Sequence, residues 1–151
     1  MAQNDTLTDL LLPSHVHLRV RAASKSALLA EIAKRAAASC GLPDAVIGQA
    51  LAAREALGST GFGNGIAVPH ARLAGLSNLF CAVLVLEKPV AYDAVDGRPV
   101  DLVFLLLSPE GGNTAHLAVL AAASRRLRQS DVAAALRAAA TPEEVIAALA
   151  G

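Results

Sequence analysis

His70 is the residue whose setting most strongly indicates chemistry. It follows Pro69, which ends the short β-prone segment 65–68 and fixes the backbone directly before the imidazole. We therefore expect His70 to project from a rigid strand end. The preceding segment 58–65 holds four glycines in eight residues, and glycine permits left-handed backbone and the close approach of another molecule. A lone histidine is more often an ordinary surface or core residue, so the case for chemistry depends on its neighbours.

The glycine-rich segment matches neither of two common phosphate-binding patterns. A P-loop needs Gly-x4-Gly-Lys followed by Ser or Thr, and segment 58–65 contains no lysine. A dinucleotide-binding turn follows a strand and opens a helix, whereas this segment follows a predicted helix and enters a predicted strand. An irregular loop explains it equally well. Ser59 also lacks the strand–turn–helix setting of a nucleophilic serine.

His116 and Arg54 are the companions that the sequence offers to His70. His116 falls in the first turn of a predicted helix, where free N–H groups and the positive end of the helix dipole favour an anion. Two imidazoles around an anion suit phosphoryl transfer, one as a neutral nucleophile and the other as a stabiliser of the phosphoryl oxygens. Arg54 could supply a charge-assisted fork to the same oxygens. The alternative for Arg54 is a solvated helix residue.

Two other polar groups have simpler explanations. His15 and His17 lie on one face of a predicted strand without Asp, Glu or Cys at ligand spacing. We therefore expect exposed strand residues, with no metal and no cofactor. Asp93, Asp96 and Asp101 surround a predicted turn and a strand entry, positions that Asp favours in any case.

Five helices are predicted to position these side chains. They cover residues 24–40, 43–57, from Asn113 or Thr114 to 127, a short helix from Ser130, and a last helix from Thr141 to the chain end. Gly41 supplies a left-handed position after the first helix, and Pro43 suits the first position of the second. Ser130 is expected to cap the fourth helix. Thr141 and Glu144 form a capping box.

Four strands are predicted, at residues 15–21, 65–68, 79–86 and 100–107. The first alternates apolar and polar residues, as a half-exposed strand does. The last two are continuous apolar runs, which suit central strands covered on both faces. The turn signal Asp96-Gly97 between them favours an antiparallel pair. We therefore predict an α/β fold, a three-layer helix–mixed sheet–helix sandwich that forms a single domain.

Composition and charge exclude several classes of protein. The 151 residues carry 13 basic and 13 acidic side chains, and only 3% are aromatic. A nucleic-acid binder would show a basic excess and aromatic platforms, so we expect no nucleic-acid partner. The apolar run 79–86 is far shorter than the about 20 residues of a membrane span, and residues 1–5 lack the features of a secretory signal. We expect a cytoplasmic protein without direct membrane insertion, with Cys40 and Cys81 as free thiols.

Residues 54–70, which begin with Arg-Glu and end with Val-Pro-His, resemble the active-site signature of type-2 enzyme IIA domains. These domains belong to the phosphoenolpyruvate-dependent sugar phosphotransferase system, in its fructose, mannitol and nitrogen branches. Segments 89–104, 116–120 and 141–145 are also similar to the family, so the resemblance covers almost the whole chain. It implies one enzyme IIA domain at residues 5–150, with a mixed sheet between helices.

The resemblance also implies roles for individual residues. His70 would accept a phosphoryl group from a small HPr-like phosphocarrier protein. His116 would be the supporting imidazole and Arg54 a phosphate contact. Ser59, Thr60 and Gly61 are further candidates for phosphate binding.

The branch of the system is indicated by segments 7–16 and 89–104, which look most like the nitrogen-regulatory type. That type controls target proteins through its phosphorylation state. Two alternatives stay open: an enzyme IIA component that donates to a fructose- or mannitol-type transporter, and a binding module that is never phosphorylated. Phe62 stands where the family more often has an aliphatic residue, so a difference in partner contact is expected there. No oligomeric state is predicted.

Overall fold

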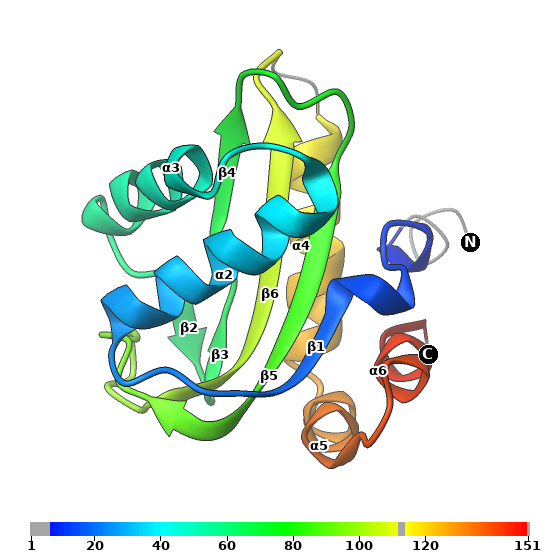
Figure 1. Ribbon diagram of the computed structural model, residues 1–151. Coiled ribbons are helices and arrows are strands. Elements are labelled where there is room, and N and C mark those ends of the chain that lie inside the picture. The colour runs from blue at the N-terminus through cyan, green and yellow to red at the C-terminus, as the bar shows by residue number, and fades with distance from the viewer. Residues whose placement is uncertain (1–6, 112–113, 151) are drawn as a thin grey trace.

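A mixed β-sheet forms the centre of the computed structural model, which describes residues 7–111 and 114–150 (Figure 1). Its strands are β1 (Val16–Val20), β2 (Gly61–Gly63), β3 (Ile66–Ala67), β4 (His70–Leu73), β5 (Phe80–Val90) and β6 (Val100–Pro109). The spatial order is β1-β5-β6-β3-β2, and β4 also pairs with β6. β5 and β6 are antiparallel, whereas β1 runs parallel to β5, and β3 and β4 run parallel to β6. The predicted antiparallel pair and the mixed sheet are confirmed.

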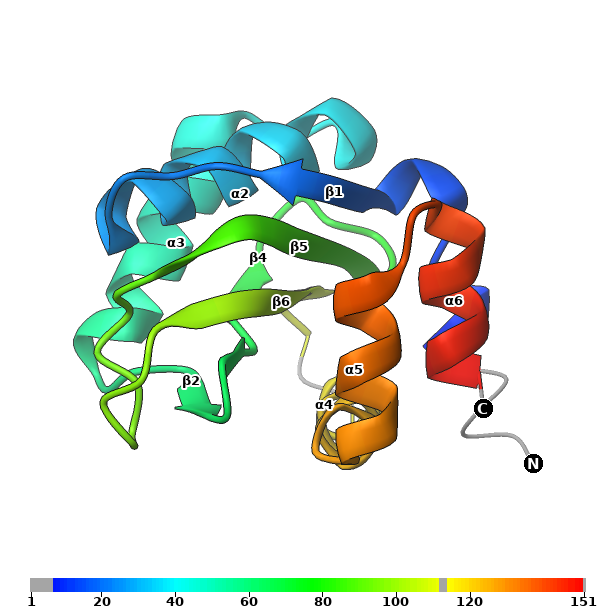
Figure 2. The same ribbon diagram turned by 90° about the horizontal axis from the view of Figure 1, so that it is seen from below.

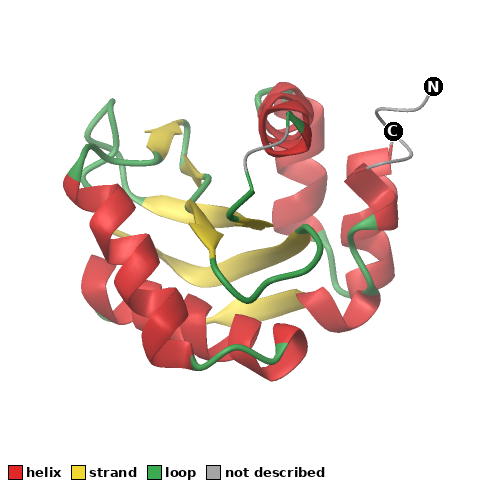
Figure 3. Cartoon of the chain, turned by 90° about the horizontal axis from the view of Figure 1, so that it is seen from above, coloured by secondary structure: helices red, strands yellow, loops and turns green. Residues whose placement is uncertain are grey.

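Helices cover both faces of this sheet (Figures 2 and 3). They are η1 (Pro13–His15), α2 (Lys25–Cys40), α3 (Asp44–Ala56), α4 (Ala115–Leu127), α5 (Ser130–Ala138) and α6 (Pro142–Ala150). α2 and α3 pack on one face and α4, α5 and α6 on the other, which confirms the three-layer sandwich. Thr114 directly precedes α4, and Asn113 lies outside the described residues. None of the helices described here is long and apolar enough to cross a bilayer.

The two long strands join the layers because they are apolar on both faces. Leu84 and Val103 belong to the apolar cluster with α2 and α3, whereas Val83 and Phe104 belong to the cluster with α4, α5 and α6. All four side chains are at most 1% exposed. Since successive side chains of a strand point to opposite faces, a continuous apolar run is what such a central strand needs.

The predicted helix ends agree with the structure to within a residue or two. Gly41 ends α2 with φ 82°, and Thr141 and Glu144 exchange the two bonds of the capping box at 3.2 and 3.3 Å. Two details differ. Pro43 has an extended backbone (ψ 141°) and is the N-cap of α3, not its first residue. Ser130 is the first residue of α5 and not its cap, because Gln129 before it already holds the extended cap position.

β1 changes faces in its middle, which its sequence alternation does not predict. Val16 pairs with Val83 on the α6 side, whereas Val20 pairs with Leu86 and packs in the cluster with α2. Arg19 between them has φ 54°, and one extra residue of β1 is accommodated here. This β-bulge shifts the inward–outward pattern by one residue.

The chain enters the site through an interrupted strand. β3 covers only two of the residues predicted at 65–68. Pro69 has no N–H and breaks the ladder, although its carbonyl oxygen accepts from the backbone N–H of Leu106 at 3.1 Å. The ladder then resumes, so His70 begins β4, opposite Leu106, instead of ending a strand. Since β3 before Pro69 and β4 after it both pair with the central strand β6, the backbone that leads into His70 and away from it is fixed.

Candidate functional site

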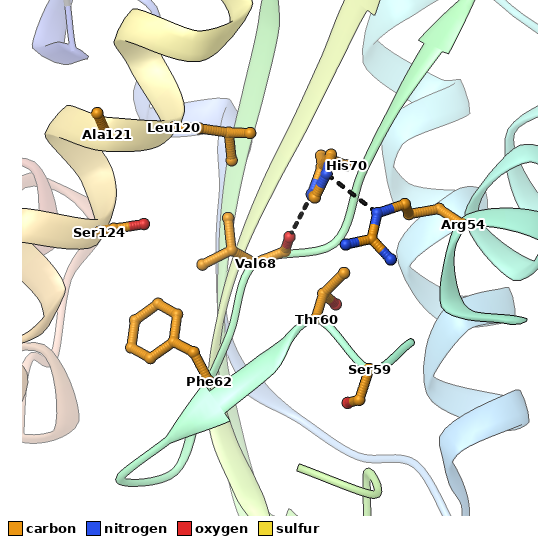
Figure 4. A pocket seen from close by; sticks show the side chains of 9 residues that line it. All are labelled: Arg54, Ser59, Thr60, Phe62, Val68, His70, Leu120, Ala121 and Ser124. Atoms are coloured by element: carbon orange, nitrogen blue, oxygen red, sulfur yellow. Dashed lines mark hydrogen bonds between the residues drawn. The ribbon is translucent and has the colours of Figure 1, made fainter. Parts of the chain in front are cut away.

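His70 is held by two hydrogen bonds that determine where its ring proton lies. Its Nδ1 is 2.9 Å from the carbonyl oxygen of Val68 (Figure 4). Because a carbonyl oxygen only accepts, Nδ1 carries the proton, and the neutral ring has its lone pair on Nε2. Arg54 Nε donates to this Nε2 at 3.3 Å. The half-buried imidazole is therefore oriented with a nucleophilic nitrogen beside a guanidinium.

Arg54 reaches His70 from the last turn of α3. Its Nη1 donates to the carbonyl oxygen of Gly58 at 2.8 Å, just beyond the end of the helix. The two bonds hold the guanidinium plane beside the imidazole. A guanidinium held in this way has further N–H groups that suit phosphate oxygens. Arg54 is thus more than a solvated helix residue.

His116 approaches His70 from the first turn of α4. The two ring centroids are 5.5 Å apart, with an interplanar angle of 61°. His116 is only 5% exposed, and its Nδ1 is hydrogen-bonded to the hydroxyl of Ser108 on β6. Burial lowers the pKa of His116, and the positive charge of Arg72, with the neighbouring His70 ring, lowers it further. His116 is therefore a neutral ring at pH 7. We call His70, Arg54 and His116 the His70 cluster.

A second polar group, the Glu55 cluster, adjoins the glycine-rich segment and comprises Glu55, Lys25, Thr60 and Tyr92. The Glu55 side chain is 5% exposed and pairs with Lys25 Nζ at 2.9 Å. Thr60 donates to it through its backbone N–H at 3.1 Å and through its hydroxyl, and the Tyr92 hydroxyl donates at 3.1 Å. Burial raises the pKa of Glu55, but the bonds from Thr60 and Lys25 outweigh burial and hold this pKa below its ordinary value.

The three loop residues expected to bind phosphate have donors that are engaged inside the protein. The Ser59 hydroxyl donates to the carbonyl oxygen of Tyr92 and accepts from the backbone N–H of Gly61, both at 3.1 Å. Thr60 directs its backbone and hydroxyl donors to Glu55. A phosphate contact from these residues would have to replace such bonds. In this structure the hydrogen bonds of these residues stabilise the glycine-rich segment.

From Gly61 on, the glycine-rich segment forms a β-hairpin with β3, whereas residues 58–60 are the connection that leads from α3 into it. Asn64 and Gly65 join β2 to β3 with φ values of 57° and 80°, as in a type I′ turn. Asp96 accepts from the backbone N–H of Asn64 at 3.0 Å. Arg137 donates to the Asn64 carbonyl oxygen at 2.7 Å while it pairs with Asp101. The Asn-Gly pair is the sequence signal that predicts such a hairpin.

The two histidines near the N-terminus lie away from this site. His15 belongs to η1 and packs against Phe80 with ring centroids 4.6 Å apart, and His17 lies 3.2 Å from an Arg35 nitrogen. Both are half-buried, so the expectation of exposed strand residues was wrong: Phe80 and α2 cover them. Asp93 is exposed and lies 4.0 Å from Lys25. Across residues 7–111 and 114–150, no group of three or more His, Cys, Asp or Glu could hold a metal ion.

Two surface depressions meet at His70. One, of about 380 Å³, extends toward β2 and the second half of α4, where Phe62 and Ser124 line it (Figure 4). The other, of about 540 Å³, lies between α3 and the start of α4. Arg54, His70 and Leu120 line both. The His70 cluster therefore opens to the surface from two sides.

Glu55, Tyr92 and Ser108 were not predicted as part of the site. For Glu55 a signal exists, because Ile47, Leu51 and Glu55 are spaced i, i+4 and i+8 and so share the buried face of α3. No local pattern indicates Tyr92 or Ser108, since tertiary folding alone brings them to Thr60 and His116.

Comparisons with known proteins identify the family of this chain. A sequence profile described as "Phosphoenolpyruvate-dependent sugar phosphotransferase system, EIIA 2" matches residues 9–151. A nitrogen regulatory protein of Pseudomonas aeruginosa is 46% identical over 91% of this chain and 90% of its own; one of Escherichia coli is 40% identical over 96% and 91%. The crystal structure of nitrogen regulatory protein IIA-Ntr from Neisseria meningitidis matches with a TM-score of 0.90 and 37% identity, over 95% of this chain and 99% of that one. The chain therefore belongs to the type-2 enzyme IIA family of the phosphoenolpyruvate-dependent sugar phosphotransferase system.

Proposed function

We propose that this chain is a phosphohistidine carrier of the nitrogen branch, which accepts a phosphoryl group on His70 from an HPr-like phosphocarrier protein. Its phosphorylation state then regulates target proteins. The nitrogen branch is supported by relatives that carry the name nitrogen regulatory protein and match this chain over about nine-tenths of their length. Because it would accept and pass on this phosphoryl group, the chain would act as a protein-histidine phosphotransferase with a regulatory role. The cytoplasm, where the donor would be met, is the proposed location.

The observation that carries this proposal is the 2.9 Å distance from His70 Nδ1 to the Val68 carbonyl oxygen, from which the tautomer of His70 follows. Nε2 holds the lone pair because Nδ1–H donates to the Val68 carbonyl oxygen. In the proposed step this lone pair forms a new N–P bond while the N–P bond of the donor's phosphohistidine breaks, and that electron pair returns to the donor's ring. His70 releases no proton in the step. The positive charge that its ring gains is stabilised by the Val68 carbonyl oxygen, which accepts the hydrogen bond from Nδ1–H.

Arg54 and His116 are proposed to stabilise the transferred group. Arg54 Nε donates to His70 Nε2 at 3.3 Å. A phosphoryl group bonded to this nitrogen would replace that hydrogen bond and lie beside the guanidinium. His116 is neutral at pH 7, so if the Ser108 hydroxyl donates a hydrogen bond to Nδ1, the one ring proton lies on Nε2 and can be donated to a phosphoryl oxygen. Ser59, Thr60 and Gly61 are proposed to shape the loop rather than to hold phosphate directly.

Labelling with radioactive phosphoenolpyruvate, enzyme I and the HPr-like carrier of the same organism tests the proposal. Wild type and a His15→Ala control should be labelled, and His70→Ala should not. Undiminished label in His70→Ala would overturn the site, and no label in wild type with active upstream proteins would favour a pure binding module. Loss of fructose or mannitol uptake in a deletion strain would favour the transport alternative over regulation.

A further inference from the structure

The surface around His70 combines exposed apolar side chains with uncompensated positive charge. Leu57, at the end of α3, is 84% exposed, and Leu117, on α4, is 62% exposed. Both line the larger depression beside His70. Large apolar side chains grouped at a functional site are typical of a protein contact surface.

Arg72 supplies the charge on one side of His70. The two residues are separated by one position on β4, so their side chains leave the strand on the same side, while Ala71 between them is buried. Arg72 is exposed and lines the larger depression. It forms no ion pair within residues 7–111 and 114–150.

Arg128 supplies charge on the other side. Its guanidinium carbon lies 4.9 Å from the ring centroid of Phe62, over a ring that lines the smaller depression beside His70. This cation–π contact holds the exposed guanidinium at the edge of the depression. Phe62 thus has a specific consequence, since an aliphatic residue at this position offers no aromatic face to Arg128.

Among the residues that the structure describes, no Asp or Glu lines either depression, so no carboxylate there balances the charges of Arg54 and Arg72, which do line them. The charge therefore exceeds what one phosphoryl group beside Arg54 needs, and it extends to Arg128, beyond the phosphoryl position. Charges at the rim of a contact surface chiefly set association rate and partner choice.

We propose that Leu57, Leu117, Arg72 and Arg128 form a docking face for the phosphocarrier that delivers the phosphoryl group, and that this carrier presents carboxylates around an apolar centre. The proposal rests on the function proposed above. The leucines pack against the apolar centre of the carrier, and the two arginines meet its acidic rim on opposite sides of His70. Phe62 determines the partner by positioning Arg128.

The test compares two phosphodonors on the same variants. The phosphorylated HPr-like carrier must dock, whereas phosphoramidate, a small phosphoryl donor, reacts with His70 without docking. Arg72→Glu and Arg128→Glu should each lower kcat/KM for the carrier about tenfold and weaken its dependence on ionic strength. Labelling of Arg128→Glu by phosphoramidate should stay within about twofold. Lys34→Glu makes the same charge change at an exposed position of α2 and should leave both rates unchanged.

Each other outcome has a defined meaning. Unchanged or faster transfer from the carrier in the Glu variants would overturn the acidic rim. Equal loss with both donors in Arg128→Glu would also overturn it, because this arginine would then act on the chemistry. If neither donor labels His70 in wild type, the proposed function fails rather than the docking face.

Discussion

Arg54 and Glu55 are neighbours in the chain, yet they belong to two polar clusters of opposite character. In the Glu55 cluster a carboxylate that is 5% exposed is enclosed by Lys25, Thr60 and Tyr92. In the His70 cluster a half-buried imidazole keeps a lone pair beside Arg54 and opens to two surface depressions. The last turn of α3 thus directs Arg54 outward to the open cluster and the next side chain, Glu55, inward to the closed one.

This difference indicates two roles: the Glu55 cluster stabilises the fold, and the His70 cluster carries the reactive group. The Glu55 cluster connects the start of α2, the end of α3, the glycine-rich hairpin and the connection after β5. Since its polar atoms are satisfied by one another, it fixes the frame from which Arg54 reaches His70. The His70 cluster keeps room for an incoming group. Four changes should separate these two roles, beginning with the largest expected effect.

Glu55→Ala should destabilise the protein most. It leaves Lys25 and the Thr60 donors without their buried partner, and breaking a buried ion pair in this way costs about 3–5 kcal/mol. The free energy of unfolding from chemical denaturation measures the effect. The control is Glu87→Ala, which removes an exposed ion pair with Arg21 and should change little. Equal losses of unfolding free energy in the two variants would contradict a structural role of the Glu55 cluster.

His116→Ala should reduce transfer more than any control histidine. If its Nε2–H stabilises the phosphoryl oxygens, the transfer rate falls about 10²-fold, the scale of removing one preorganised donor. The rate is measured at a temperature at which circular dichroism finds the variant folded. His17→Ala, which removes a half-buried histidine on β1, should keep the wild-type rate. A near-normal transfer rate in His116→Ala would show that His116 only packs beside His70 and does not stabilise the phosphoryl oxygens.

Gly65→Ala should cost a smaller amount of stability, through the hairpin that links the clusters. Gly65 has φ +80°, and a Cβ here would lie 2.6 Å from Nη2 of Arg137 and 2.9 Å from Oδ1 of Asp101. The left-handed backbone costs about 1–2 kcal/mol for a residue with a Cβ, and the clash adds to it. Gly97→Ala is the matched control, with φ +76° and no atom within 4 Å of the added Cβ. A smaller loss in Gly65→Ala than in Gly97→Ala would contradict the packing of Arg137 and Asp101 around the turn.

The smallest expected effect is a pH dependence of stability. The pKa of Glu55 lies below its ordinary value of 4.5 in the folded protein, so its stabilisation is fully present above about pH 4.5. It is lost as the pH falls through the lower, folded pKa. Tm measured between pH 7 and pH 3 should therefore fall more steeply in wild type than in Glu55→Gln. Parallel curves would show that the carboxylate is not preferentially ionised in the fold.

Much of the fold can be predicted from the sequence because its signals are local. The continuous apolar runs around Leu84 and Phe104 require strands covered on both faces, and the Thr141 capping box fixes a helix start. The bulge at Arg19 escapes prediction, because pairing with β5 and packing on both faces determine it. β4 also escapes prediction, because its polar–apolar alternation covers only four residues, directly after the strand-breaking Pro69.

The site was predictable in part for the same reason. The context of Pro69 and the glycines indicates His70, the positions of His116 and Arg54 on predicted helices indicate its companions, and the family resemblance implies a role for each. The Glu55 cluster depends on contacts between segments far apart in the chain, with Thr60 and Tyr92 separated by 32 residues. Residue types alone therefore indicate donors such as Thr60 as phosphate contacts, whereas the fold directs them to Glu55.

The nitrogen that carries the phosphoryl group is the most direct test of the account. The bond from Nδ1–H to the Val68 carbonyl oxygen leaves Nε2 as the nucleophile. Long-range ¹H–¹⁵N and ³¹P–¹⁵N NMR correlations of the ¹⁵N-labelled protein, before and after phosphorylation, identify the nitrogens involved. We expect the proton on Nδ1 of His70 before the reaction and phosphorus coupled to Nε2 of the same ring afterwards. Phosphorus on Nδ1 of His70, or on any other residue, would contradict the account.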